Sequence, residues 1–382
     1  FGAPEASIYG RFGKHFENFV EEYSGGSIDV KLRCCNQIAT EDEAFKAMQL
    51  GTVDGFFITA NNVSPHWSLM DVTVLPYIFQ NTAHLDRVLN GEVGQFMKDK
   101  LQEDTSVHLL AFGPALYRDF YNSVRPINEM ADMQGLKIRV PKNEVMIATF
   151  EAFGANPVPL AWSETPTALQ TGTVDGGDNG TSFIRDMKFY EFEPHLVILE
   201  HFVAFAPLFA SDAFMKRLND DQIAIIQKAA TAAGAALAKE VATETEEIRN
   251  WLATEGGMAM TTPDKTDFVE AAKTVQNAFA QKRDAEFVEL VQKIQAAANS
   301  SMRDNLVGEV LILGQTDAKT QKQLDMSPLT YPVKPSAYVQ SPDAESIKAL
   351  LVGDQSGQRL LHLGELIGRK DVPVSLAANA IV

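Results

Sequence analysis

An arginine inside an apolar strand is the residue of this sequence best suited to bind an anion. Arg139 lies within "LKIRVP", a run that reads as a strand and closes at Pro141. Alternation along a strand places its side chain on the face opposite to those of Ile138 and Val140. The planar guanidinium binds a carboxylate through two parallel hydrogen bonds. Arg139 therefore either pairs with a carboxylate of the protein or lies at a cleft that takes an anionic ligand.

The motifs of well-known enzyme classes are missing from the sequence. It holds no GxxxxGK[ST], no GxGxxG after a strand, no HExxH and no GxSxG. The histidines are scattered, and the spacing of His195 and His201 suits no metal motif. We therefore predict that the protein is not an enzyme and that it holds no metal and no cofactor.

A segment of eight residues occurs twice with small changes. "MQLGTVDG" covers residues 48–55, and "LQTGTVDG" covers residues 169–176. Each copy ends a helical pattern, supplies a glycine for a left-handed cap (Gly51 or Gly172) and begins a strand. The repeat thus indicates a helix-to-strand connection used twice. The copies diverge after the shared Asp-Gly, to "FFITANN" and "GDNG", and this divergence is not explained by turn chemistry.

The elements around these copies alternate between helix and strand. This alternation predicts an α/β architecture with mainly parallel sheets, arranged as two lobes that each carry a sheet. Long Ala- and Glu-rich helices are expected to span or brace the lobes. The predicted helices cover 8–24, 40–50, 143–155, 219–254 and 264–298, and the predicted strands include 27–34, 52–60, 107–113 and 136–141.

The composition narrows the classes of partner. The 382 residues carry a formal net charge of −17, which argues against nucleic acid or anionic lipid because phosphate binding needs a basic face. A small anionic ligand needs only one or two buried arginines and stays compatible. No run of roughly 18 or more apolar residues is present, so we predict no membrane span. No leader-like segment opens the chain, so we expect no signal peptide in it.

The two cysteines, Cys34 and Cys35, are adjacent in the sequence. Neighbouring cysteines form a disulfide only with strained geometry, and no metal-binding spacing surrounds them. We expect two unpaired strand residues, with a redox pair as the alternative.

Several runs resemble one family of binding proteins. "MADMQGLKIRVP", "GANPVPLAWSE" and "ALQTGTVDG" are similar to motifs of the second lobe of the periplasmic substrate-binding proteins of TRAP transporters, the DctP-like family. "FVEEYSGGSIDVKL", "MQLGTVDG" and "VLPYIF" are similar to its first lobe. The resemblance covers about residues 1–300. It implies a two-lobed periplasmic protein that closes on a small organic acid and delivers it to the transporter's membrane subunits.

The resemblance also implies a set of residues that contact the ligand. In that family the arginine of the "KIRVP" motif grips the ligand carboxylate, and an asparagine after the second "VDG" reaches the ligand and is expected to face that arginine across the cleft. A pocket aromatic, a second arginine upstream and polar residues of the first lobe assist. The corresponding positions are Arg139, Asn179, Trp162, Arg118 (with Arg125 as the alternative), Thr59, Asn62 and Glu41 (with Asp42 as the alternative).

The domain prediction follows the same resemblance. We assign 1–116 and 205–243 to lobe I and 117–204 and 244–300 to lobe II, joined by hinge strands. Residues 301–382 form a separate β-rich segment with strand-like runs "VGEVLILG", "YPVKP" and "RLLHLGEL". This tail is similar to the small β-barrel that precedes the ATPase domain of HerA-like translocases. No phosphate-binding loop follows "ANAIV", so we assign the tail no nucleotide site and no function.

Two hypotheses about function remain. The leading one is a solute-binding protein for transport. The alternative is an extracytoplasmic module that senses the same kind of ligand and signals through an appended domain. An enzyme is a distant third hypothesis, because no nucleophile–base pair is present in the motifs.

Overall fold

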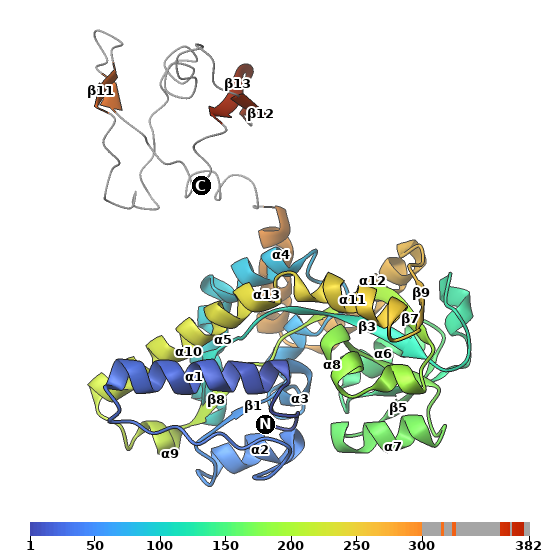
Figure 1. Cartoon of the computed structure of the whole chain (residues 1–382), viewed down its shortest axis with the longest axis horizontal. Coiled ribbons are helices and arrows are strands. Elements are labelled where there is room, and N and C mark those ends of the chain that lie inside the picture. Colours follow the sequence, from blue (N-terminus) through green and yellow to red (C-terminus); the bar gives the residue numbers. More distant parts are fainter. Residues whose placement is uncertain (300–314, 317–322, 326–359, 367–368, 378–382) are drawn as a thin grey trace. The chain divides into compact units, whose positions relative to one another are not determined.

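The computed structural model describes residues 1–299, 315–316, 323–325, 360–366 and 369–377. The chain divides into two compact units, Phe1–Ala298 and Asn299–Val382. The first unit holds all the predicted site residues, and its elements are those of a mixed α/β protein (Figure 1).

Two sheets form the centre of the first unit. The smaller has the strand order β1 (Gly55–Phe57), β8 (Leu208–Ser211), β2 (Val107–Ala111), and both of its pairings are antiparallel. The larger has the order β5, β4, β6, β3, β7, β9. Its strands are β5 (Asn156–Pro159), β4 (Lys137–Val140), β6 (Gly176–Gly180), β3 (Leu116–Asn122), β7 (His195–Ala204) and β9 (Ala259–Thr261).

The expectation of mainly parallel sheets is met only in part. Within the larger sheet β4 pairs in parallel with β5 and β6, and β7 with β9, whereas β3 pairs antiparallel with β6 and β7. The smaller sheet has no parallel pairing. Strand β3 follows β2 of the smaller sheet with no helix between the two strands.

Helices cover both sheets. Those in the first half are α1 (Ile8–Ser24), α2 (Glu41–Gln49), α3 (Ala60–Val63), α4 (Thr82–Leu89), α5 (Glu92–Thr105) and α6 (Glu144–Ala152). Those in the second half are α7 (Thr165–Gln170), α8 (Thr181–Asp186), α9 (Asp212–Met215), α10 (Asp220–Val241), α11 (Glu244–Thr254), α12 (Thr266–Lys282) and α13 (Ala285–Asn299). Short 3-10 helices are η1 (Ser68–Thr73), η2 (Met130–Met133), η3 (Trp162–Glu164) and η4 (Phe189–Glu191).

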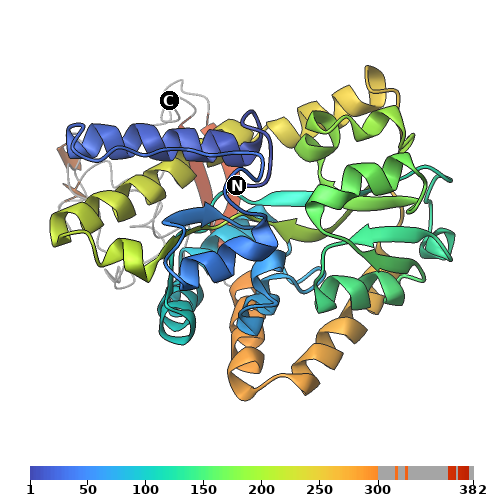
Figure 2. The ribbon, with the colours of Figure 1, turned by 90° about the horizontal axis from the view of Figure 1, so that it is seen from below.

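Helix α1 shows how the sequence determines an element. The Ser7 side chain caps its start by accepting a hydrogen bond from the Gly10 N–H, and Gly25 ends it with φ +59°. Phe12, Phe16 and Val20 form its buried face. This face packs on α10, and the two helices lie side by side in Figures 1 and 2. The predicted bounds of this helix agree with the structure.

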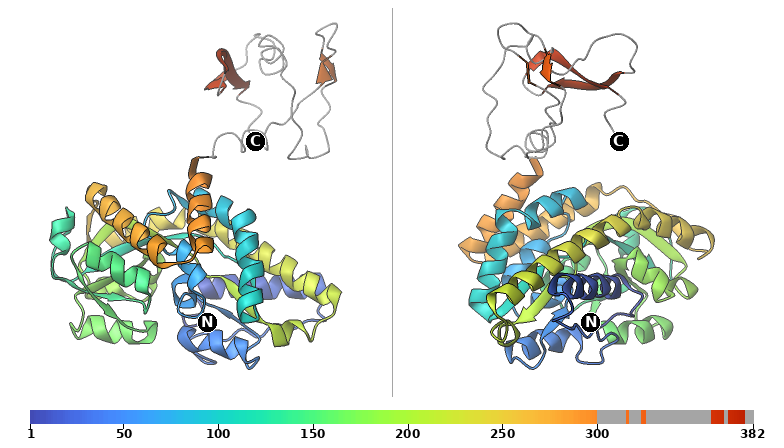
Figure 3. Two further views of the ribbon diagram at one scale, coloured as in Figure 1. Left: turned by 180° about the vertical axis from the view of Figure 1, so that it is seen from behind. Right: turned by 60° about the vertical axis from the view of Figure 1, so that its left-hand side comes forward.

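The chain passes between the two sheet regions four times. It leaves β2 of the smaller sheet for β3 of the larger one, returns from β7 to β8, and passes from α10 to α11. Helix α10 packs on β2, and α11 packs on α8 beside the larger sheet. Helix α13 (orange in Figure 3) then reaches back to α4. There the Ile294 carbonyl lies 2.8 Å from His84 Nε2.

Both copies of the repeat fold as predicted. Gly51 and Gly172 have φ of +72° and +68°, in the left-handed region. The Gly51 N–H donates to Met48 O (3.0 Å), and the Gly172 N–H donates to Leu169 O (3.1 Å). Strands β1 and β6 begin four residues later, at Gly55 and Gly176. The correspondence continues to the helices that follow, since the cap residues Thr59 and Gly180 share nearly the same backbone angles.

Three local predictions are wrong. Residues 27–34 form no strand, although the Arg33 carbonyl accepts a hydrogen bond from the backbone nitrogen of Phe1 at 3.1 Å. Each predicted long helix is two helices, with breaks between α10 and α11 and between α12 and α13. Cys34 and Cys35 are not unpaired strand residues. They lie in a turn and are joined by a disulfide, with Cys35 at φ +60°.

The described part of the second unit contains two separate antiparallel pairings. These are β10 (Gln315–Thr316) with β11 (Gln323–Asp325), and β12 (Leu360–Leu366) with β13 (Arg369–Ala377). The predicted strand "RLLHLGEL" corresponds to β12, whereas "VGEVLILG" and "YPVKP" lie outside the described residues. Nothing in the described part supports the resemblance to a HerA-like barrel.

Candidate ligand-binding site

All seven predicted site residues line one pocket of about 380 Å³, part of which is open to solvent. They are Glu41, Thr59, Asn62, Arg118, Arg139, Trp162 and Asn179. Ala3, Tyr9, Asn61, Pro141 and Phe183 complete the lining. Elements near the smaller sheet supply one wall through α1, α2 and the start of α3. Strands β3, β4 and β6, η3 and α8 supply the other. Two sheet regions thus meet at a single site.

Arg139, on β4, is a buried cation without a carboxylate partner among the described residues. Its side chain is 3% exposed, and its Nε and Nη2 both donate to the Leu160 carbonyl, at 3.1 and 2.8 Å. A guanidinium carries five N–H donors, so those on Nη1 keep no acceptor in the described protein. Burial lowers the pKa of Arg139 to about 10. The group stays charged at neutral pH and unneutralised, which favours an anion in the pocket.

Arg118, on β3, is neutralised by the protein itself. Its Nε donates to Asp178 Oδ2 at 2.6 Å, and its Nη2 donates to Asp178 Oδ1 at 3.1 Å and to the Asp178 carbonyl at 2.6 Å. His201 Nε2 lies 3.2 Å from the same Asp178 Oδ2. Burial would raise the pKa of Asp178, but the charge of Arg118 and these hydrogen bonds outweigh it and hold the pKa below its usual range. Arg118 therefore has less capacity for a ligand than Arg139.

Asn179 is oriented by its own surroundings. Its Oδ1 accepts from the Gly180 N–H at 2.9 Å and from Arg118 Nη1 at 3.4 Å. Its Nδ2 has no acceptor among the described residues and can donate to a ligand. Asn179 does not face Arg139 across the cleft as expected: the two residues lie on adjacent strands of the same sheet, β6 and β4. They belong to the same wall of the pocket.

Three aromatic rings form the apolar part of the pocket. The guanidinium of Arg139 lies 5.7 Å from the centre of the Trp162 ring, within reach of a cation–π interaction. Trp162 meets Phe183 edge to face at 5.9 Å, and Phe183 meets Tyr9 of α1 at 5.2 Å. The Tyr9–Phe183 contact joins the two walls. The rings can therefore pack against the carbon skeleton of a ligand from both sides of the site.

The opposite wall is organised around Glu41, a carboxylate that is 8% exposed. Its Oε2 accepts from the Thr59 N–H (3.0 Å), Thr59 Oγ1 (3.1 Å) and Asn62 Nδ2 (2.8 Å). Burial raises the pKa of Glu41, and these hydrogen bonds oppose the rise. Thr59 and Asn62 thus line the pocket but spend these donors on Glu41, so we infer that they position it.

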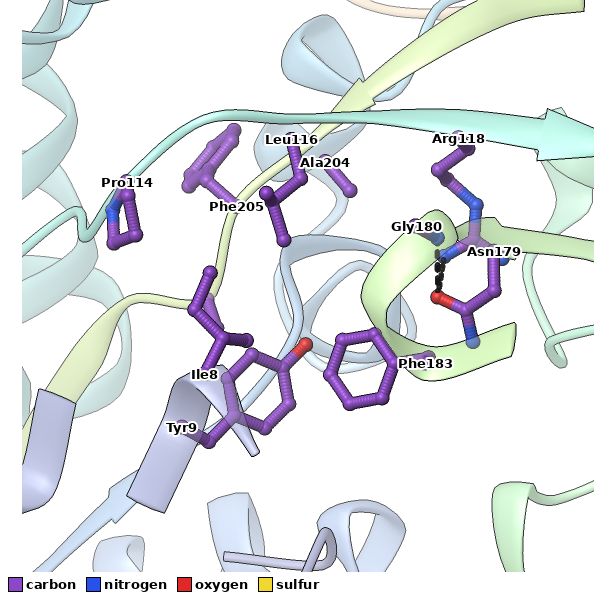
Figure 4. A pocket seen from close by; sticks show the side chains of 11 residues that line it. Ile8, Tyr9, Pro114, Leu116, Arg118, Asn179, Gly180, Phe183, Ala204 and Phe205 are labelled. Carbon is purple, nitrogen blue, oxygen red and sulfur yellow. Dashed lines mark hydrogen bonds between the residues drawn. The ribbon is translucent and has the colours of Figure 1, made fainter. Parts of the chain in front are cut away.

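A second, mostly apolar pocket of about 360 Å³ adjoins the first (Figure 4). The two share Tyr9, Arg118, Asn179 and Phe183. Figure 4 shows Pro114, Leu116, Ala204 and Phe205 around it, from the segments where the chain passes between the two sheets. The polar site thus continues toward the crossing strands as an apolar chamber.

The two alternative residues lie elsewhere. Arg125 donates from Nε to Asp132 O at 2.8 Å and from Nη2 to Gln134 O at 2.7 Å, so its fork holds a loop. Asp42 lies within 3.7 Å of Lys142 and does not line the Arg139 pocket.

Sequence reasoning missed Tyr9, Phe183, Asp178 and His201. Tyr9 carried no signal beyond the helical pattern of α1. Asp178 was detectable in principle, because it is an acidic residue directly before Asn179 and its carboxylate can pair with an arginine of a neighbouring strand. His201 was considered only as a metal ligand, whereas it contacts Asp178.

Comparison with known proteins places the chain in a family. Residues 2–283 match the model of DctP, family 7 of the bacterial extracellular solute-binding proteins. The chain belongs to this family. The 2,3-diketo-L-gulonate-binding periplasmic protein of Escherichia coli K12 is 30% identical over 263 residues, which are 68% of this chain and 78% of the relative. That relative is named as a binding protein and not as an enzyme.

Solved structures agree with this assignment. The TRAP periplasmic solute-binding protein of Polaromonas sp. JS666, bound to D-erythronate, superposes with a TM-score of 0.73 at 28% identity, covering 77% of this chain and 95% of that one. The protein of Sulfurospirillum deleyianum with bound succinate gives 0.72 at 27% identity, covering 78% and 96%. The predicted two-lobed fold and the resemblance to TRAP solute-binding proteins are thereby confirmed. Within the described residues, no helix has the length and apolar character needed to span a bilayer.

Proposed function

We propose that this protein binds a small organic acid between its two lobes in the periplasm, without chemical change, and delivers it to the membrane subunits of a TRAP transporter. Arg139 binds the ligand carboxylate, Asn179 donates to it and Trp162 packs against the ligand. Arg118 holds Asn179 in place, and Thr59 and Asn62 position Glu41. The observation that carries this proposal is the buried, unneutralised guanidinium of Arg139 in a pocket lined from two sheet regions.

The physical argument concerns desolvation. A carboxylate enclosed between lobes costs several kcal/mol unless it is paired, and the same holds for an enclosed guanidinium. Binding an acid neutralises both groups at once. Relatives and structural neighbours named for carboxylic acids support this ligand class. The alternative of a signalling module has no comparable support.

We also propose the lobes as 1–116 with 205–243, and 117–204 with 244–300. In support, β1, β2 and β8 fall into the first set, and the strands of the larger sheet fall almost wholly into the second. Closure about the crossing strands would bring the two walls together on the ligand. Asn143 Nδ2, 3.2 Å from the Asn61 carbonyl, joins the walls near the pocket.

A thermal-shift screen tests the proposal. The purified protein is heated with sugar acids, keto acids and aromatic acids, and in parallel with the neutral sugars that lack only the carboxylate. A ligand that binds only the folded state adds about 2.7 kcal/mol of stability at 100 times its dissociation constant. We expect at least one acid to raise the melting temperature and its neutral counterpart to leave it unchanged. A rise with neutral sugars and none with acids would contradict the carboxylate site.

A further inference from the structure

A buried carboxylate is an unusual component of a pocket that takes an acid. Glu41 lines the same pocket as Arg139, and its three hydrogen-bond donors all end on Oε2. Oε1 has no donor among the described residues. Because Oε2 is fixed by Thr59 and Asn62, Oε1 is held at the pocket wall as an acceptor. An acid can bind at Arg139 without help from Glu41, so the presence of this carboxylate in the pocket needs a separate explanation.

The charges that line the pocket balance in a particular way. They come from Glu41, Arg118 and Arg139. Asp178 neutralises Arg118 through two hydrogen bonds from the guanidinium to its carboxylate. What remains for a ligand is one cation, Arg139, and the carboxylate of Glu41, whose charged form is favoured by the three donors on Oε2. No ion pair joins these two within the described structure. A ligand with one carboxylate therefore finds a charged partner for it, whereas a second carboxylate finds no second unneutralised cation in the lining and meets the charge of Glu41.

We propose that Glu41 makes this pocket selective for hydroxylated monocarboxylates: its Oε1 accepts a hydrogen bond from a ligand hydroxyl, and its charge rejects a second carboxylate. This inference rests on the proposed function, since it names the class of acid that the same site takes. The other polar side chains of the lining are neutral, namely Tyr9, Thr59, Asn61, Asn62, Trp162 and Asn179. Neutral donors and acceptors suit the hydroxyls of a sugar acid.

Calorimetric titration with matched acids tests the selectivity. D-Erythronate and meso-tartrate differ only in a terminal hydroxymethyl group that becomes a carboxylate, and D-gluconate and D-glucarate differ in the same way. D-Glucosaminate replaces one hydroxyl of gluconate by an ammonium group. We expect the wild-type protein to bind the monocarboxylate of at least one pair, and to bind it at least about 10-fold more tightly than the dicarboxylate, a difference of roughly 1.4 kcal/mol.

Glu41→Gln tests whether this residue is responsible. Glutamine keeps an oxygen for the Thr59 and Asn62 donors and removes the charge. We expect the ratio of the two dissociation constants to fall about 10-fold or more, mainly because the dicarboxylate binds better. Glu43→Gln is the matched control, since Glu43 lies in the same first turn of α2 but is exposed, and it should leave the ratio unchanged. A merely structural role of Glu41 would weaken both acids alike.

The possible outcomes separate this inference from the proposed function. Equal or tighter binding of the dicarboxylates by wild-type protein overturns the inference but leaves the carboxylate site at Arg139 standing. Tighter binding of D-glucosaminate than of D-gluconate does the same, because the partner of Glu41 would then be an ammonium group and not a hydroxyl. An unchanged ratio in Glu41→Gln also overturns it. If this variant does not fold, the wild-type comparison of the matched pairs still decides. Failure of every acid to bind contradicts the proposed function as well.

Discussion

Arg118 and Arg139 are two buried arginines of one sheet, on the strands that flank β6, and they have opposite electrostatic surroundings. Arg118 binds the carboxylate of Asp178, which belongs to β6. Arg139 is opposite Gly177 of β6, which has no side chain, and its one hydrogen-bond acceptor among the described residues is the Leu160 carbonyl. The role of each arginine thus follows from its neighbours. Arg118 links β3 to β6 through Asp178, and Arg139 is available to a ligand.

The largest expected effect is a difference in folding stability between a variant of Arg118 and a variant of Arg139. Arg118→Met should lower the free energy of unfolding by about 3–5 kcal/mol, because it leaves the buried Asp178 carboxylate without its main partner. Urea unfolding of the ligand-free protein measures this. Arg139→Met serves as the control and should leave the stability equal or higher, since it removes an unneutralised buried charge. Equal losses in the two variants would abolish the distinction.

The next largest effect is the loss of ligand affinity on removal of the Arg139 side chain. Arg139→Ala should weaken binding of an acid found in the thermal-shift screen by roughly 2–5 kcal/mol, because the buried ligand carboxylate loses its charge partner. Calorimetric titration of the variant against wild type gives the difference. Near-wild-type affinity in Arg139→Ala would refute the role of this residue.

Lowering the pH should weaken the stabilisation of the folded state by the Arg118–Asp178 pair, whereas Arg139 should not contribute to this pH dependence. The pKa of Asp178 lies below the ordinary value of 3.8, so the pair stabilises the folded state above about pH 4 and loses this contribution as the pH falls further. The stability difference between wild type and Arg118→Met should therefore shrink between pH 7 and pH 3. Denaturant unfolding at both pH values tests this, and a difference that grows toward pH 3 would show that the sign is wrong.

The smallest effect concerns the ring beside Arg139. Trp162→Leu should weaken acid binding by about 0.5–1 kcal/mol, the size of a partly exposed cation–π interaction. The same titrations detect it. Phe192→Leu is a control on an aromatic outside the pocket and should bind as wild type does. A loss in Trp162→Leu as large as that in Arg139→Ala would mean that the tryptophan, and not the charge, dominates binding.

The sequence was informative where local patterns and motifs coincide. The bounds of α1, the glycine caps at Gly51 and Gly172, and strand β4 around Arg139 all follow from spacing and turn chemistry. The lining of one pocket by all the predicted residues follows from the family motifs, which mark strand ends and the starts of helices. The contact of these residues with a ligand stays a prediction.

Long-range pairing was beyond local patterns. The neutralisation of Arg118 depends on the register between β3 and β6, and the alternation within one strand does not reveal it. The extended run 27–34 has a strand-like alternation but belongs to neither sheet. The Cys34–Cys35 disulfide depends on a turn in which Cys35 adopts a positive φ, which the residue types do not indicate. These features are set by tertiary context.

The repeated "GTVDG" precedes residues of both walls of the pocket. Its two copies build the same connection in two sheets, and both lead to the pocket. The first leads to Thr59 and Asn62, which hold Glu41. The second leads to Asp178, which binds Arg118, and to Asn179, which lines the site. Shared residues build the scaffold, and the residues that differ build the two walls.

The most direct test of whether Arg139 binds the ligand carboxylate is a crystal structure of the protein with an acid from the thermal-shift screen. We expect the ligand carboxylate to lie against the Nη1 side of Arg139, with oxygens at about 2.7–2.9 Å from the guanidinium nitrogens, while the Arg118–Asp178 pair stays intact. A carboxylate bound to Arg118 with Asp178 displaced, or one that touches neither arginine, would contradict it.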